Sequence, residues 1–209
     1  MAEPERTIET LEFVGGDAAL DFANTGSERV DGHVQTERLH TYADLVVFAD
    51  RVGLLDDEQA AGLLTLAAER PQEAAHVLAR AIELRECIFR IFTAIADGRR
   101  PADDDVETLN GFLAEGLSYR RLVRDSRCCA WTWSTGENPL AQMLWPIASG
   151  AAELMVHGEL DRVKECGNEG CDWLFLDLSR NRSRRWCDMK ECGNRAKARR
   201  HYARHRASD

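Results

Sequence analysis

Four cysteines near the C-terminal end of the chain have the spacing of a metal site. They fall as Cys166-x4-Cys171-x15-Cys187-x4-Cys192, so a loop separates two short pairs and lets them close over one ion. Four thiolates in a tetrahedral arrangement suit Zn2+, which prefers soft ligands and needs no open coordination position when its role is structural. We therefore predict one structural Zn2+ held by these four thiolates.

Two other uses of four cysteines compete with zinc. Disulfides need an oxidising compartment, and residues 1–10 are acidic and polar, without the basic and apolar regions of an export signal. An iron–sulfur cluster also takes four cysteines, but its known spacings differ from this one. A reducing cytoplasm is the expected location, and the short apolar runs predict no membrane span.

The residues around the cysteines form a second pattern. The chain reads Trp173-x-Phe175-x-Asp177-x-Ser179-Arg180-Asn181-x-Ser183-Arg184-Arg185-Trp186-Cys187 and then Cys192-Gly193-Asn194-Arg195. Over residues 163–206 this pattern resembles the CGNR zinc-finger proteins, with no departure at these positions. The resemblance implies a bacterial transcription regulator that binds DNA through this module.

Side chains between and after the cysteines are expected to support the metal site. Four apolar groups can shield the ion in a module too small for a core of its own, and these are Trp173, Phe175, Trp186 and Met189. Asn181 and Asn194 are expected to brace the module, by donating to sulfur or by capping the backbone.

Charge is distributed unevenly along the chain. The net charge of −9 would alone argue against nucleic-acid binding. From Lys164 onward, however, twelve Lys and Arg face seven Asp and Glu, whereas residues 1–163 hold fifteen against twenty-nine. A localised basic patch, rather than total charge, sets the attraction for phosphate. The sequence therefore predicts an acidic body with a basic C-terminal module.

Basic side chains of the module are the candidates for nucleic-acid contact. They lie in the loop before Cys187 and in a helix expected after Cys192, at Arg180, Arg182, Arg184, Arg185, Arg195, Lys197, Arg199 and Arg200. Guanidinium groups contact phosphates bidentately and read guanine edges, and a helix of this size enters the major groove. In a competing interpretation these charges are solvated or bind the acidic body of the same chain.

The elements that must position this module are predicted to be mainly α-helical. Apolar residues recur at helical spacing after a capping box at Thr41 and Asp44, and again over residues 56–70, 72–97, 106–117 and 138–158. Residues 119–123 and 130–134 are two short runs rich in aromatic and β-branched residues around Asp125 and Ser126, which predicts a β-hairpin. We expect residues 1–160 to form a helical bundle with this hairpin, and residues 161–209 a zinc-binding domain built from a β-hairpin and a basic helix.

Several local details accompany this division. Pro146 should kink the helix over residues 138–158, and the acidic run 103–105 should be surface charge beside a helix start. Cys87 lies in a helical apolar pattern and is expected to be buried, whereas Cys128 and Cys129 should alternate between the faces of a strand. Residues 161–165 read as a short link, which predicts that the zinc module docks closely on the bundle.

The start of the first domain carries a small polar cluster. Gly15 and Gly16 can form a turn, and Asp17 can cap the helix that follows. Together with the zinc motif, this start resembles the putative stress-induced transcription regulator domain that precedes CGNR fingers, whose polar positions are matched by Asp21, Asn24 and Thr25. These three residues either form a small-molecule or inter-domain site, or tie down the last turn of the helix.

Common catalytic signatures are missing from the sequence. It has no glycine-rich phosphate loop, no His-Glu-x-x-His pair and no nucleophile elbow, and four thiolates leave a zinc ion no position for water. We therefore predict a non-enzymatic, zinc-dependent, DNA-binding regulator whose N-terminal domain senses a small-molecule effector or forms a homodimer. The alternative is an interaction protein in which zinc is purely structural, or in which the module binds RNA or a protein.

Overall fold

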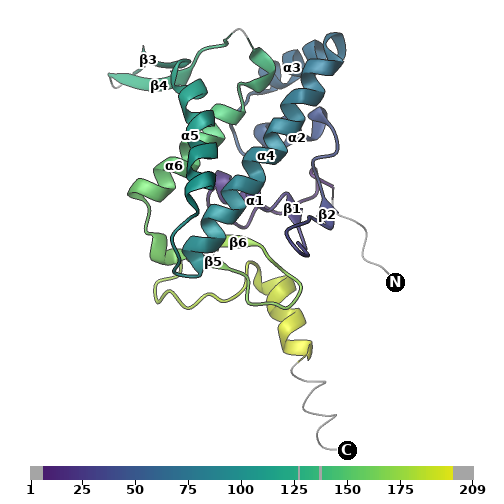
Figure 1. Ribbon diagram of the computed structural model, residues 1–209, viewed down its shortest axis with the longest axis vertical. Coiled ribbons are helices and arrows are strands. Elements are labelled where there is room, and N and C mark those ends of the chain that lie inside the picture. Colours follow the sequence, from purple (N-terminus) through teal and green to yellow (C-terminus); the bar gives the residue numbers. More distant parts are fainter. Residues whose placement is uncertain (1–6, 127, 137, 200–209) are drawn as a thin grey trace, which may run out of the picture.

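The computed structural model describes residues 7–126, 128–136 and 138–199. It shows a helical body with the four-cysteine module at one end and a β-hairpin at the other (Figure 1). The predicted mainly α fold is confirmed, and the sheets of the described residues are all two-stranded. Arg200 and the rest of the predicted basic helix lie outside the described residues.

Helix α4 (Pro71–Ala96) is the axis of the body. Pro71 occupies its first turn, where a missing N–H costs no hydrogen bond. The helix contacts five other helices, α1 (Ala18–Ala23), α2 (Tyr42–Arg51), α3 (Asp57–Glu69), α5 (Asp103–Leu117) and α6 (Leu144–His157). Cys87 is fully buried in this core, as predicted.

Local signals set the ends of several helices. The predicted capping box of α2 is present, with Thr41 and Asp44 each accepting from the other's backbone N–H. Helix α3 (Asp57–Glu69) begins with a second capping box, formed by Asp56 and Gln59. Gly53 and Gly98 follow α2 and α4 with φ of 75° and 70°, a conformation that glycine adopts without the strain of a Cβ atom.

Two sequence predictions in this region are corrected. Pro146 does not kink a long helix, because the segment divides into a 3-10 turn (η1, Pro139–Ala141) and helix α6, and Pro146 falls in the first turn of α6, where no donor is needed. The acidic run at the start of α5 is not all surface charge. Asp105 is buried and accepts from Arg90 at 2.8 Å, which compensates its charge.

Two small antiparallel sheets belong to the body. The short strands β1 (Gly26–Ser27) and β2 (Thr36–Glu37) pair beside α4, in a stretch whose composition resembles a surface loop. Strands β3 (Arg120–Arg124) and β4 (Cys129–Trp133) form the predicted hairpin, and the ring of Trp133 lies 6.4 Å from that of Trp145 on α6. Cys128 and Cys129 are both exposed, with their sulfurs 3.8 Å apart, so they do not alternate between faces.

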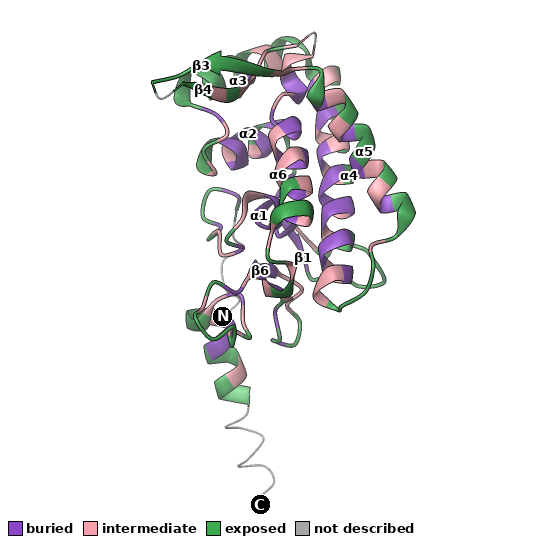
Figure 2. Cartoon of the chain, turned by 90° about the vertical axis from the view of Figure 1, so that its left-hand side faces the viewer, coloured by how far each residue is buried: buried purple, intermediate pink, exposed green. Residues whose placement is uncertain are grey.

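The segment that joins body and module is a strand rather than a link. After the 3-10 turn η2 (Leu160–Arg162), β5 (Val163–Glu165) pairs with β6 (Leu174–Leu176). Val163 and Leu174 are buried in the same apolar core as α4. Figure 2 colours the buried part of β6, next to the body, in purple. The module is therefore docked closely, as predicted, but through shared core residues that a short link would not supply.

Candidate metal centre and basic surface

The first cysteine pair lies at the open end of the β5–β6 hairpin. Cys166 follows β5, and its N–H continues the ladder by donating to the Trp173 carbonyl at 2.9 Å. The chain then turns back, with the Cys171 N–H donating to the Asn168 carbonyl at 3.0 Å and Gly170 at a φ of 76°. This tight turn brings both thiols of the pair to one side of the hairpin.

The second pair lies at the start of the C-terminal helix. The Asp188 carboxylate accepts from the Glu191 N–H at 2.9 Å, which caps a turn of π-helix, η3 (Met189–Gly193). The chain continues as helix over residues 194–199. Cys187 precedes the cap and Cys192 lies within the turn, so the cap sets the separation of the two thiols.

The four sulfurs have the spacing of a tetrahedral metal site. All four lie within 4.8 Å of one another. The Sγ atoms of Cys171 and Cys187 are 3.8 Å apart, and those of Cys187 and Cys192 are 3.6 Å apart. Zinc–sulfur bonds of about 2.3 Å in a tetrahedron place neighbouring sulfurs about 3.8 Å apart. The donor set is therefore that of a structural zinc, and its four thiolates complete the coordination.

Nitrogen donors around the sulfurs stabilise the thiolate form. The Cys187 N–H points at the Cys166 sulfur at 3.4 Å, and the Asn168 side chain donates to the Cys192 sulfur at 3.6 Å. Asn168 was not singled out by the sequence, although it lies inside the first cysteine pair. Asn194 instead donates to the Lys190 carbonyl at 2.7 Å, which is the predicted backbone cap.

Aromatic side chains shield the centre from one side. Phe175 is fully buried in a small cluster with the cysteines, and Trp173, Trp186 and Val14 pack against that cluster. The prediction for Met189 is wrong, because its side chain is 48% exposed. Its sulfur lies instead where a Cβ atom on Gly193 would approach it to 3.1 Å. A side chain at position 193 would therefore require Met189 to shift by a few tenths of an ångström.

A buried carboxylate organises the loop between the pairs. Asp177 is fully buried and accepts from Lys164 Nζ at 2.6 Å, from the Ser179 hydroxyl at 2.5 Å and from the Arg184 N–H at 2.9 Å. Burial acts to raise the pKa of Asp177, but these hydrogen bonds outweigh it and hold that pKa below its usual range. The ionised carboxylate thus fixes the path of the loop from Ser179 to Arg184.

One predicted DNA-contacting residue, Arg184, faces inward. Its guanidinium lies 4.4 Å from the centre of the Phe175 ring and donates to the carbonyls of Trp186 at 2.9 Å and Val14 at 3.2 Å. It also donates to the Cys187 carbonyl. These bonds direct the guanidinium away from solvent, so the structure gives Arg184 a bracing role beside the metal centre in place of the expected contact.

The other described candidates are exposed. They are Arg180, Arg182, Arg185, Arg195, Lys197 and Arg199. Three of them have acidic neighbours: Arg182 pairs with Glu159 at 3.0 Å at the end of the body, whereas Arg195 pairs with Glu191 at 3.7 Å and Arg199 with Glu169 at 3.6 Å within the module. Within the described residues, Arg180 and Lys197 have no ion-pair partner.

The polar cluster of the first domain lies at the junction with the module. Asn24 exchanges two hydrogen bonds with Leu174 on β6, at 2.9 and 2.8 Å, so it extends the edge of that strand. Asp21 accepts from the Gly15 N–H at 2.7 Å, and Thr25 donates to the Phe22 carbonyl at 2.7 Å. All three side chains are buried; Asn24 holds the end of α1 against the module, whereas the bonds of Asp21 and Thr25 stay within residues 15–25.

A second junction contact was not anticipated from the sequence. Arg29 stacks 3.5 Å from the centre of the Phe89 ring, pairs with Glu86 on α4 at 2.9 Å and donates to Asp172 at 2.9 Å. Asp172 follows a zinc ligand and also accepts from the Glu28 and Arg29 N–H groups at 3.0 and 3.1 Å. The first cysteine pair is therefore fixed to both α4 and the β1–β2 ribbon.

A helical body joined to a four-thiolate centre defines a zinc-finger protein. Residues 162–205 match the CGNR zinc finger, and residues 16–158 match ABATE, described as a putative stress-induced transcription regulator. Because the second match covers more than half of the 209 residues, the chain belongs to the ABATE family. Both families are of regulator or zinc-finger type. Comparison with curated proteins finds no match.

None of the helices formed by the described residues is both long and apolar enough to cross a bilayer.

Proposed function

We propose that this zinc-binding regulator binds DNA through the loop 180–185 and the helix that follows Cys192. The observation that carries the proposal is an exposed set of arginines on a loop whose path is fixed by the buried Asp177 carboxylate. A loop held in one conformation loses little entropy on binding, so its arginines can contact phosphates at low cost. Total charge opposes this association, but the basic residues lie at the end of the molecule away from most of the acidic body (Figure 1).

The contacts divide into two groups by availability. Arg180, Arg185 and Lys197 are exposed and have no ion-pair partner among the residues that the structure describes, so they are the first expected to meet phosphate. Arg182 and Arg195 must first leave Glu159 and Glu191. Exposed ion pairs of this kind contribute about 0–1 kcal/mol, so a DNA phosphate can displace them.

The test is the salt dependence of DNA affinity. We expect zinc-loaded protein to bind a pool of random duplexes, followed by fluorescence anisotropy, with affinity falling steeply as salt rises. Substituting Arg180 and Arg185 with alanine should flatten the slope of log K against log salt by about 1.8, because each lost phosphate contact removes about 0.9. Zinc content should not change, since neither side chain contacts a ligand sulfur.

A matched control comes from the body of the protein. Arg70→Ala with Arg99→Ala removes two exposed positive charges at sites distant in sequence from the module. If this pair flattens the slope as much as Arg180→Ala with Arg185→Ala, net charge rather than the loop drives binding. Absence of any DNA affinity at low salt rejects the proposal.

The alternative function, an interaction module for RNA or a protein, is favoured by one observation. Arg182, Arg195 and Arg199 are already paired with carboxylates of the same chain, which supports a surface that can also pair with the acidic groups of a partner. Competition separates the two functions: an RNA or an acidic peptide that displaces duplex DNA at lower concentration than unlabelled duplex supports the alternative. Homodimerisation and an effector stay predictions.

A further inference from the structure

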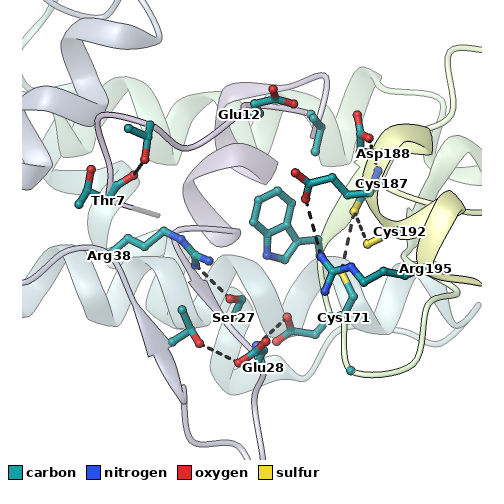
Figure 3. Close-up of a pocket in the computed structure, with 17 residues that line it drawn as sticks. Thr7, Glu12, Ser27, Glu28, Arg38, Cys171, Cys187, Asp188, Cys192 and Arg195 are labelled. Atoms are coloured by element: carbon teal, nitrogen blue, oxygen red, sulfur yellow. Dashed lines mark hydrogen bonds and ion pairs between the residues drawn. The ribbon is translucent and has the colours of Figure 1, made fainter. Parts of the chain in front are cut away.

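A cavity of about 660 Å³ lies at the junction of the body and the zinc module. Its walls come from the N-terminal segment 7–14, the β1–β2 ribbon and both cysteine pairs, which surround an open centre (Figure 3). Sites for small molecules occur preferentially between domains and have volumes of about 300–1,000 Å³. This junction cavity does not include Asp21, Asn24 or Thr25, which the sequence had suggested as ligand-binding residues.

The charge of the lining selects the class of ligand. Five carboxylates and two guanidinium groups face the junction cavity, which leaves a net negative surface at neutral pH. Two of the carboxylates are engaged by backbone N–H groups, those of Asp172 and Asp188. Within the described residues the carboxylate of Glu12 has no partner. A partly open site of this sign attracts cations and disfavours anions.

An aromatic side chain in the lining limits the class of ligand further. Trp173 is half-buried in the lining, and the guanidinium of Arg38 lies 5.6 Å from the centre of its ring. The indole therefore already interacts with one organic cation. An ammonium group on an apolar skeleton matches a site that combines an aromatic wall with carboxylates.

One lining pair connects the junction cavity to the basic surface. Glu191 and Arg195 both line it, and their side chains pair across one helical turn at 3.7 Å. A ligand cation that binds Glu191 competes with Arg195 for the same carboxylate. The guanidinium that is released then becomes available to phosphate.

We propose that the junction cavity binds small organic ammonium compounds through Glu12, Glu191 and Trp173, and that an occupant frees Arg195 for a DNA phosphate. The second half rests on the proposed function, in which Arg195 belongs to the DNA-contacting surface. Because coupling between two ligands is reciprocal, DNA must strengthen amine binding by the same factor.

The binding half is tested without DNA. Zinc-loaded, 15N-labelled full-length protein is titrated with 2-phenylethylamine, which is protonated at pH 7, and with 3-phenylpropionate, which has a similar skeleton and the opposite charge. The indole Nε1–H resonance of Trp173 is followed, and it is assigned from backbone experiments so that no folding variant is needed. We expect a saturable shift with the amine and none with the acid. An equal shift with both, or no saturable shift, overturns the proposal.

Two matched variants locate the amine. Glu12→Gln removes a lining carboxylate, and Glu9→Gln removes an exposed carboxylate of the same segment that lies outside the lining. We expect Glu12→Gln to weaken amine binding about 5-fold, as for the loss of a partly exposed ion pair, and Glu9→Gln to leave it unchanged. Equal weakening by both variants would show a general charge effect and overturn the assignment to the cavity.

The coupling half is tested by DNA affinity with and without the amine. We expect 2-phenylethylamine to tighten DNA binding of the wild type about 5-fold, at the weak end of typical couplings, and to have no effect on Arg195→Gln. Saturable amine binding without a change in DNA affinity overturns the coupling. Failure to bind DNA at all, with the Trp173 shift intact, rejects the proposed function but leaves the cavity assignment supported.

Discussion

Helix α4 of the body buries ten of its residues against neighbouring elements, whereas the zinc module has a separate buried cluster of only four residues, three of which are cysteines. The body can therefore be held by apolar burial, at about 25 cal/mol for each Å² removed from water. The module cannot, and relies on the metal, on Asp177 and on strand residues that it shares with the body.

The body and the module also differ in where their charged side chains lie. In the body, the buried Arg85 is matched by Glu37 at 2.5 Å and Glu86 at 2.8 Å. Burial acts to raise the pKa of Glu86, but the bonds from Arg29 and Arg85 outweigh it and lower that pKa. In the module most of the described arginines are exposed, and the buried polar side chains are those of Asn168 and Asp177. We therefore expect DNA contact at the exposed arginines of the module rather than at the body.

The largest effect is expected from removing a zinc ligand. Cys187→Ser should abolish zinc binding and unfold the module locally, because metal binding supplies much of the folding free energy of such modules. The helices of the body should survive, and far-UV circular dichroism should lose only a small part of its helical signal. Metal analysis by mass spectrometry and circular dichroism check both parts.

An exposed cysteine supplies the control for that variant. Cys128→Ser changes a thiol of the β3–β4 hairpin, at the other end of the molecule from the module, and should keep full zinc content. If Cys187→Ser abolishes the entire helical signal, the body and the module form one cooperative unit. The comparison between two differently stabilised regions would then not hold.

The shared core residue Leu174 should give the next largest effect. Leu174 lies on β6 but is fully buried in the core of the body, so Leu174→Ala should lower the free energy of unfolding by about 2–5 kcal/mol. Leu178→Ala, at a side chain that is 68% exposed, should change it by less than about 0.5 kcal/mol. Denaturant unfolding of zinc-loaded protein measures both. We propose that the division between residues 160 and 161 separates two sequence families. It does not separate two cores, because Leu174 belongs to the module by sequence but is buried in the core of the body.

Local structure was predictable where the residues that determine it are close together in the sequence. The capping box at Thr41 and Asp44, the hairpin over residues 119–134 and the four-cysteine spacing each depend on neighbours in sequence, and all three are present. Pro146 misled the prediction because proline is tolerated in a first turn as well as at a kink, and only the helix start decides between them.

Contacts between distant segments were not predictable in the same way. Asn24 meets Leu174 across 150 positions and Arg29 meets Asp172 across 143, and neither pair has a local signal. Arg184 looked like its exposed neighbours in the sequence, yet the ring of Phe175 and nearby carbonyls hold it inward. The place of Asp177 in an alternating run with Trp173 and Phe175 is a local signal for its burial, but only the fold shows its partners.

A smaller effect is expected when the polar organiser of the module is changed. Asp177→Asn keeps the shape of the side chain but removes the charge that pairs with Lys164. It should lower the free energy of unfolding by about 1–3 kcal/mol, since Lys164 keeps partial access to water. Hydrogen exchange should quicken in the loop 179–184. Asp125→Asn, on the exposed turn of the β3–β4 hairpin, is the control and should change neither measurement.

The smallest effect should come from Asp21, which accepts from the Gly15 N–H, while the Gly15 carbonyl accepts from Leu176 on β6. Burial, together with the charge of Asp17, raises the pKa of Asp21 to about 6, against the bond from the Gly15 N–H. Between its ordinary value of 3.8 and about 6, the folded state binds more protons than the unfolded state, so stability falls as pH rises through this window. At pH 7 the charged, buried carboxylate therefore costs stability.

Asp21→Asn removes this cost while its side-chain oxygen can still accept from Gly15. We expect the variant to be more stable than wild type at pH 7 by about 1–2 kcal/mol, and the difference to vanish near pH 4. Taking the difference from wild type at each pH cancels the protonation of the zinc ligands, which both proteins share. Asp50→Asn, on an exposed face of α2, should show no such trend. A variant that is less stable than wild type at pH 7 would mean that the Asp21 charge itself stabilises the junction, which would make the contact between the two regions electrostatic rather than a matter of hydrogen-bonded packing.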